Sequence, residues 1–140
     1  MWWFIEDTLE AMGADVVTVA RSDYPSAGVL SDLEGIMPNC RGVIVLGFRQ
    51  VEISRGRWRP GPPGERSIYG AAEATPWNPL EARLAAALRL PMFVVHDSGV
   101  AGGVFDIKGD VVTVVADIDD ALGRNQTRTS LQQWLIELVG

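Results

Sequence analysis

Hydrophobic residues follow two different spacings along the chain. Between residues 2 and 12 they recur every three or four positions, which predicts a helix with one buried side. Residues 14–20 form a short run rich in β-branched side chains, which predicts a strand. Residues 42–47 are apolar almost throughout, as in strands buried on both faces of a parallel sheet. The chain is therefore expected to alternate helices with strands.

The remainder of the chain continues this alternation. Further helices are expected at about 29–37, 78–89 and 131–138, and further strands at 91–96 and 111–115. The expected caps are Ser26 for the first of these helices and Thr129 or Ser130 for the last. This order predicts an α/β fold in three layers, a mostly parallel sheet covered by helices on both faces. Residues 1–140 suit a single domain with one core.

The order of elements at the N-terminus departs from the usual one. Folds of this kind normally open with a strand, whereas this chain opens with a helix. The usual first strand is therefore expected to be lacking. Ligands in such folds bind at the carboxyl ends of the strands, and the turn after the first strand often contributes to that site. An uncovered apolar surface would also favour a homo-oligomer.

The alternation is interrupted between residues 49 and 76, where a flexible Arg/Gly/Pro loop is expected. The segment contains several glycines together with Arg49, Arg55, Arg57, Arg59, Arg66, Pro60, Pro62 and Pro63. A loop of this length in a compact domain is usually functional or disordered. Two interpretations stay open: a solvated loop with a partly covered Trp58, or a lid whose arginines bind phosphates while Trp58 covers a ring.

Composition narrows the range of partners. The net charge of −6 argues against a nucleic-acid partner, which usually requires a basic surface. Cys40 is the only cysteine, so neither an internal disulfide nor a cysteine metal site is expected, in keeping with a cytoplasmic protein. His96 is the only histidine; it ends a predicted strand and is interpreted as a packing residue rather than a metal ligand. No run of about 18 apolar residues predicts a membrane span.

The segment from Trp77 to Glu81 is the leading candidate for chemistry. Asn78 as N-cap, Pro79 at the first helical position and Glu81 at the third follow the capping-box pattern, and Thr75-Pro76 offers a second cap register, so a structural role is one interpretation. The second interpretation is catalytic. A carboxylate near a helix N-terminus is stabilised as the anion, which is the form that acts on a sugar carbon in glycoside chemistry.

The same segment resembles two known families. Thr75-x-Trp77-x-x-x-Glu81 is similar to the Ser-x-Trp-x-x-x-Glu segment of TIR domains, whose glutamate is catalytic in NAD-cleaving members. The spacing from Glu81 to Ala85 and Pro91 resembles that of nucleoside 2-deoxyribosyltransferases, in which a nucleophilic glutamate opens a helix. Both families have a flavodoxin-like fold. The resemblance implies that fold for this chain, together with chemistry on a nucleotide or nucleoside.

The implied activity is cleavage or transfer at an N-glycosidic bond, as in an NAD glycohydrolase or a deoxyribosyltransferase. Glu81 would be the catalytic residue, and no cofactor or metal is needed. The substrate-binding residues would be Trp77, Thr75, Asp97, Arg57 and Arg59. Trp77 can equally be a packing residue at a helix start. Two alternatives for the whole chain also stay open: a non-catalytic module for nucleotide sensing or protein interaction, and a truncated inactive domain.

Overall fold

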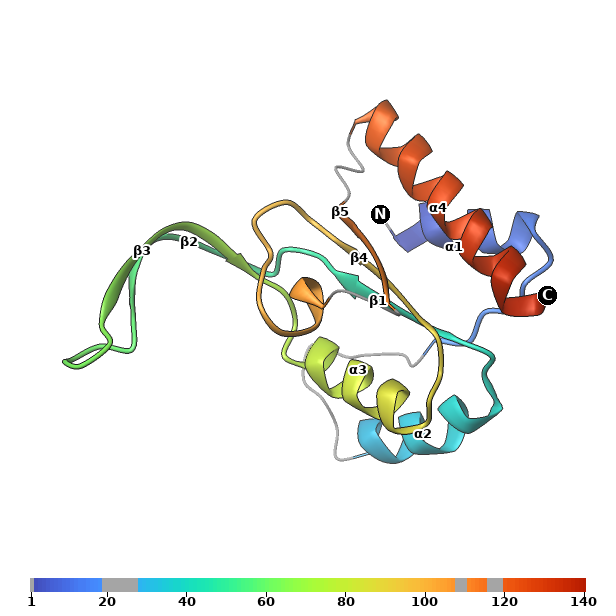
Figure 1. Cartoon of the computed structure of the whole chain (residues 1–140), viewed down its shortest axis with the longest axis horizontal. Coiled ribbons are helices and arrows are strands. Elements are labelled where there is room, and N and C mark those ends of the chain that lie inside the picture. Colours follow the sequence, from blue (N-terminus) through green and yellow to red (C-terminus); the bar gives the residue numbers. More distant parts are fainter. Residues whose placement is uncertain (1, 19–27, 108–110, 116–119) are drawn as a thin grey trace.

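The protein is an α/β structure whose strands form two separate sheets (Figure 1). This computed structural model describes residues 2–18, 28–107, 111–115 and 120–140. The central sheet is parallel, with strand order β1-β4-β5. Its strands are β1 (Val43–Gly47), β4 (Met92–His96) and β5 (Val112–Val115). All three lie where the apolar runs predict strands, so the prediction of a mostly parallel α/β sheet is confirmed.

Helices cover both faces of this sheet (Figure 1). The described helices are α1 (Trp2–Ala11), α2 (Val29–Ile36), α3 (Trp77–Ala87), α4 (Ala121–Val139) and two short 3-10 turns, η1 (Met37–Asn39) and η2 (Gly103–Asp106). The central strand β4 shows the layering, because alternate side chains of a strand point to opposite faces. Phe93 and Val95 pack with α1 and α4, whereas Met92 and Val94 pack with α3.

The largest buried side chains of the core lie on the α1/α4 face. Phe93 is fully buried, and its ring lies 5.6 Å from that of Trp134 in α4. Ile5 in α1 and Leu131 in α4 are also fully buried in the same cluster. Burying a large apolar side chain contributes about 1.5–3 kcal/mol, so this cluster is a principal source of stability. The apolar spacing of the first and last helices follows directly from these contacts.

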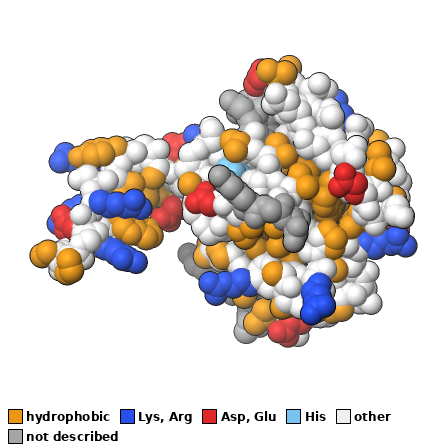
Figure 2. All heavy atoms as spheres, viewed as in Figure 1, with side chains coloured by type: hydrophobic (Ala, Val, Ile, Leu, Met, Phe, Trp, Pro, Cys, Tyr) orange, Lys and Arg blue, Asp and Glu red, His pale blue; other side chains and the backbone are white. Residues whose placement is uncertain are grey.

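The segment at 49–76, expected to be a flexible loop, is instead mostly β-structure. Strands β2 (Val51–Trp58) and β3 (Arg66–Glu73) pair antiparallel in a two-stranded ribbon, which we call the arm. The arm projects away from the rest of the molecule (Figures 1 and 2). Neither face of its outer part packs on a core, so these strands need no apolar alternation. A search for buried strands therefore misses them.

Other sequence predictions are corrected at the ends of elements. Residues 14–18 form no strand, and the rest of that predicted strand, like Ser26, lies outside the described residues. Helix α4 begins ten residues earlier than expected. Its N-cap is Asp120, whose carboxylate accepts a hydrogen bond from the backbone of Gly123, and neither Thr129 nor Ser130 caps it.

Across the described ranges, none of the helices has the length and apolar character that a membrane crossing requires.

Candidate functional site

The carboxyl ends of β1 and β4 meet the start of α3, and Thr75 and Asp97 of the predicted site residues lie there, with Glu81 one turn into the helix. Asn78 connects these elements. Its side-chain nitrogen donates a hydrogen bond to the carbonyl of Leu46 in β1 (3.2 Å), and its side-chain oxygen accepts one from the Thr75 hydroxyl (3.0 Å). Asn78 is only 2 % exposed. The first turn of α3 is therefore fixed to the end of the central sheet.

This contact corrects the predicted cap. The helix begins at Trp77 with Pro76 at the N-cap, and Pro76 makes no side-chain cap hydrogen bond. Asn78 is inside the first turn and turns its amide inward, because the Leu46 carbonyl and the Thr75 hydroxyl together satisfy both ends of that amide. The predicted capping box of Asn78 and Glu81 is therefore wrong. The hydrogen bonds at this end of the helix instead join Thr75 and Asn78.

Glu81 lies one turn beyond Asn78 on the buried side of α3. Residues three apart share a helix face, and the neighbouring inward positions Ala82 and Ala85 pack in the core with Val45 and Val94. Glu81 is 7 % exposed, and its side chain has an interaction partner. Burying a carboxylate is costly unless it is paired, and a helix face in contact with a sheet ordinarily holds apolar residues. The sequence therefore places an acid where packing alone would favour leucine or alanine.

Asp97 follows β4 directly and joins the two strand ends. Its Oδ2 accepts a hydrogen bond from the backbone nitrogen of Arg49 (2.8 Å), and the Arg49 Nε lies 3.8 Å from the same oxygen. The backbone nitrogen of Asp97 in turn donates to the Gly47 carbonyl (3.0 Å). The Arg49 side chain is 46 % exposed, whereas that of Asp97 is 11 % exposed. An acid and an arginine thus meet at the edge of the sheet where α/β proteins bind ligands.

His96 is a packing residue in this structure. The residue is 6 % exposed, its ring lies 5.4 Å from the Phe105 ring, and Nδ1 is 3.1 Å from the Asp97 carbonyl oxygen. Gly47 makes this arrangement possible. A Cβ at position 47 would overlap the Phe105 ring and come within 2.8 Å of the His96 Cβ. The absence of a side chain at Gly47 therefore lets Phe105 close over the ends of β1 and β4.

Trp77 is directed away from this edge. Its side chain packs with Leu33 and Met37, so it contributes to the contact between α3 and α2. This position favours the packing interpretation of Trp77 over a pocket-forming one. Thr75, in contrast, is tied to Asn78 at the edge itself, where its hydroxyl is a donor within the protein.

Arg57 and Arg59 do not join the other candidates. Both lie on the outer part of the arm, which carries them away from the sheet (Figure 1). Arg57 pairs there with Glu65 (3.4 Å). The arginine that does reach the carboxyl edge is Arg49, which the sequence predicts only as one of the arginines of the 49–76 loop. Its position directly after β1 could have identified it, because residues that follow a parallel strand line the ligand edge.

The arrangement has the groups for chemistry on a polar organic ligand. It offers the shielded carboxylate of Glu81, the carboxylate of Asp97 and the partly exposed guanidinium of Arg49, whose Nη1 donates to Glu52 (3.0 Å). Within the described ranges, no group of three histidine, cysteine, aspartate or glutamate side chains is placed to hold a metal ion. No protein-family model matches the chain, and no curated protein or solved structure is significantly similar to it.

Proposed function

We propose that the chain is a flavodoxin-like α/β domain that cleaves or transfers the N-glycosidic bond of a nucleotide or nucleoside, with Glu81 as the catalytic residue. The observation that carries this proposal is the burial of Glu81 on the sheet-facing side of α3, one turn from Asn78. The resemblance of the 75–91 segment to TIR domains and deoxyribosyltransferases supports the same assignment. The parallel sheet supports the fold, since ligands bind at the carboxyl ends of such strands.

In the proposed reaction, the Glu81 carboxylate attacks C1′ of the ribose. The C1′–N bond breaks, and its electron pair leaves with the base; an anionic base takes a proton from water. Water then attacks C1′, loses a proton to solvent and frees the carboxylate. In a transferase, a second base replaces this water. The low exposure of Glu81 suits this role, because exclusion of bulk water strengthens the interaction of a carboxylate with a positive sugar carbon.

Two other residues have supporting roles in the proposal. Asp97 accepts hydrogen bonds from ribose hydroxyls through Oδ1, since Oδ2 is engaged by Arg49. Arg49 binds a substrate phosphate in place of Arg57 and Arg59, because it alone of these three lies beside Asp97. Asn78 is a positioning residue that holds the first turn of α3 against β1.

Release of free base from NAD and from deoxynucleosides, followed by chromatography, tests the proposal. The wild-type chain is expected to release base, and Glu81→Ala is expected to lower the rate by about 10²–10³-fold, as for loss of a group that stabilises the transition state. Glu73→Ala removes an exposed carboxylate from β3 and is the matched control, which should keep the wild-type rate. Circular dichroism and thermal melting check that each variant is folded. Equal rates for the wild type and Glu81→Ala, or no base release by the wild type from either substrate class, would overturn the assignment.

The arm favours a second candidate, a module for protein interaction without catalysis. An exposed ribbon that projects from a folded body is a feature of binding surfaces rather than of enclosed active sites. In that case Glu81→Gln changes only stability, and nucleotides cause no shift in the melting temperature of either form. A nucleotide-dependent shift that Glu81→Gln or Asp97→Asn reduces supports the first candidate instead.

A further inference from the structure

The arm differs from the rest of the molecule in both contacts and charge. At its base, Ala72 is buried and pairs with Val100, and Gln50 donates a backbone hydrogen bond to Glu73. Beyond this base, the ribbon projects into solvent (Figures 1 and 2). An isolated two-stranded ribbon is marginally stable in water. A partner surface would supply the stabilisation that the body of the same chain does not.

The charge of the arm indicates the chemistry of that partner. Residues 54–69 contain four arginines and one glutamate, a net charge of +3 in a chain of −6, so the other residues carry −9. One side of the arm has a shallow hollow lined by Arg55, Gly56, Arg57, Ser67 and Tyr69. Tyr69 is 66 % exposed and pairs in register with Arg55. This side of the arm therefore offers Arg55, an exposed aromatic ring and Arg57, which is exposed while it pairs with Glu65, to an acidic, partly apolar surface.

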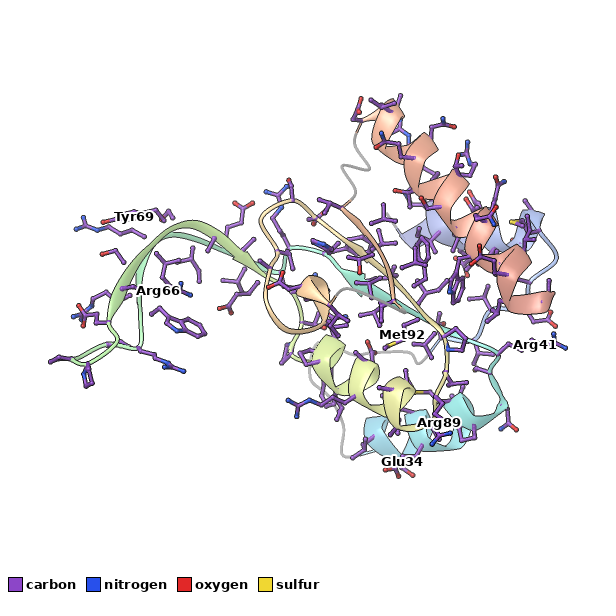
Figure 3. The ribbon with its side chains drawn as sticks, in the orientation of Figure 1. Glu34, Arg41, Arg66, Tyr69, Arg89 and Met92 are labelled. Atoms are coloured by element: carbon purple, nitrogen blue, oxygen red, sulfur yellow. The ribbon has the colours of Figure 1, made fainter. Side chains whose placement is uncertain are left out.

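The opposite side of the arm is occupied by an internal contact. Arg66 lies over the Trp58 ring, with 5.6 Å between the guanidinium carbon and the ring centroid. Tyr69 and Arg66 point from opposite sides of the ribbon (Figure 3). On the other side, Arg55 and Arg57 lie beside Tyr69, and the Arg57 side chain stays 65 % exposed although it pairs with Glu65.

A complementary surface exists on α1. Phe4, Ile5 and Leu9 face the core, so the opposite stripe of the helix is exposed. Trp3, Asp7 and Glu10 share this stripe at the helical spacing i, i+4, i+7, and Trp3 is 59 % exposed. Residues 3–18 contain four acidic residues and no lysine or arginine. The stripe thus combines an exposed aromatic ring with carboxylates, which is the complement of the arm.

We propose that the Arg55–Arg57 side of the arm binds the Trp3–Asp7–Glu10 stripe on α1 of a second copy of this chain. Residues two apart on a strand are about 6.6–6.8 Å apart, and residues three apart on a helix are about 5–6 Å apart at Cβ, so two flexible arginines match two carboxylates. Tyr69 then lies against Trp3. The arm and α1 are at opposite ends of the molecule (Figure 1), so one chain does not make this contact with itself. The contact joins different surfaces of two copies, as in a head-to-tail ring or filament.

The overall acidity of the chain favours a second copy over a nucleic acid. A phosphate backbone bound to the arm would be repelled by the charge of −9 that the other residues carry. The same negative charge on a second copy would instead attract the arm. The proposal is independent of any activity at Glu81. Failure of base release leaves it unchanged, and failure of self-association leaves the Glu81 assignment unchanged.

Sedimentation velocity over a range of concentrations tests the proposal with charge-reversal variants. The wild type is expected to self-associate, more weakly at about 500 mM salt than at about 50 mM. Arg55→Glu/Arg57→Glu and Asp7→Arg/Glu10→Arg are each expected to raise the dissociation constant by at least about 10-fold, because like charges then meet. The four substitutions combined in one chain restore opposite charges and are expected to restore association. These side chains are exposed, and circular dichroism checks that each variant is folded.

Two matched control variants reverse the same number of charges at other exposed positions. Asp32→Arg/Glu34→Arg reverses two exposed acids on α2, and Arg41→Glu/Arg83→Glu reverses two exposed arginines on the body. Both are expected to associate like the wild type. A monomeric wild type at every concentration in low salt overturns the proposal, as does failure of the combined variant to associate. Tight binding of a labelled oligonucleotide that Arg55→Glu/Arg57→Glu abolishes overturns it in favour of a nucleic-acid partner.

Discussion

Strand β4 and the arm are both β-structure, yet they depend on opposite environments. All five residues of β4 are buried, and its side chains fill the contacts to helices on both faces. In the arm, most residues of β2 and β3 are exposed, and Ala72 at the base is the one that reaches the core. The central strand is held by packing, whereas the arm is held by its own ladder of hydrogen bonds. Substitutions in β4 and in the arm are therefore expected to have very different effects on stability, although both regions are β-structure.

The largest expected effect is the loss of the Phe93 side chain. Phe93→Ala removes a fully buried ring that contacts Trp134, so the free energy of unfolding should fall by about 3–5 kcal/mol. Tyr69→Ala, the matched truncation in the arm, should change it by no more than about 0.5 kcal/mol, because Tyr69 is exposed. Urea unfolding of dilute protein measures both. Similar losses for the two variants would contradict the contrast between β4 and the arm.

This contrast also explains which parts of the fold the sequence predicts. The strands β1, β4 and β5 are recognisable as apolar runs, and the burial of β4 on both faces requires continuous apolar residues such as Phe93 to Val95. The arm is hidden because its strands contain arginine and glycine and its tip, near Pro60 and Pro63, has the composition of a loop. Local composition does not show that Arg55 pairs with Tyr69 across the tip.

The sequence likewise predicts part of the candidate site and misses part of it. Asp97 and Thr75 lie at the carboxyl edge because their positions follow from the ends of elements that the sequence predicts. The inward turn of Asn78 is not visible in sequence, since it depends on the Leu46 carbonyl, which lies 32 residues away. The distance of Arg57 from that edge depends on the direction of the arm, which tertiary structure alone determines.

A smaller effect tests how closely the site edge is packed. Gly47→Ala places a Cβ against the Phe105 ring and the His96 side chain, so we expect a loss of about 1–3 kcal/mol as these groups shift. Gly35→Ala is the control, because a Cβ there meets nothing within 4 Å and Gly35 lies inside α2. That variant should be stabilised by about 0.5–1 kcal/mol through helix propensity. Equal stability of the two variants by thermal melting would show that Phe105 does not close over Gly47.

A comparable effect is expected when the link between α3 and β1 is removed. Asn78→Ala leaves the Leu46 carbonyl without its side-chain donor and the Thr75 hydroxyl without its acceptor, at a cost of about 1–3 kcal/mol. Thr75→Val removes only the second contact and should cost less. Urea unfolding measures both, and amide hydrogen exchange in the first turn of α3 should accelerate in Asn78→Ala. An unchanged exchange rate would mean that the amide does not hold this turn.

The smallest change in the stability of the body is expected when the outer part of the arm is removed. Replacing residues 56–68 by Asn-Gly joins Arg55 to Tyr69, which are paired in register, through a turn that suits a two-residue hairpin. The body should keep its free energy of unfolding within about 0.5 kcal/mol, because the removed residues lie outside the described core clusters. A loss comparable to that of Phe93→Ala would mean that the outer arm supports the core. Preserved stability together with lost self-association would instead separate the two regions, with the body determining the fold and the arm the contact between copies.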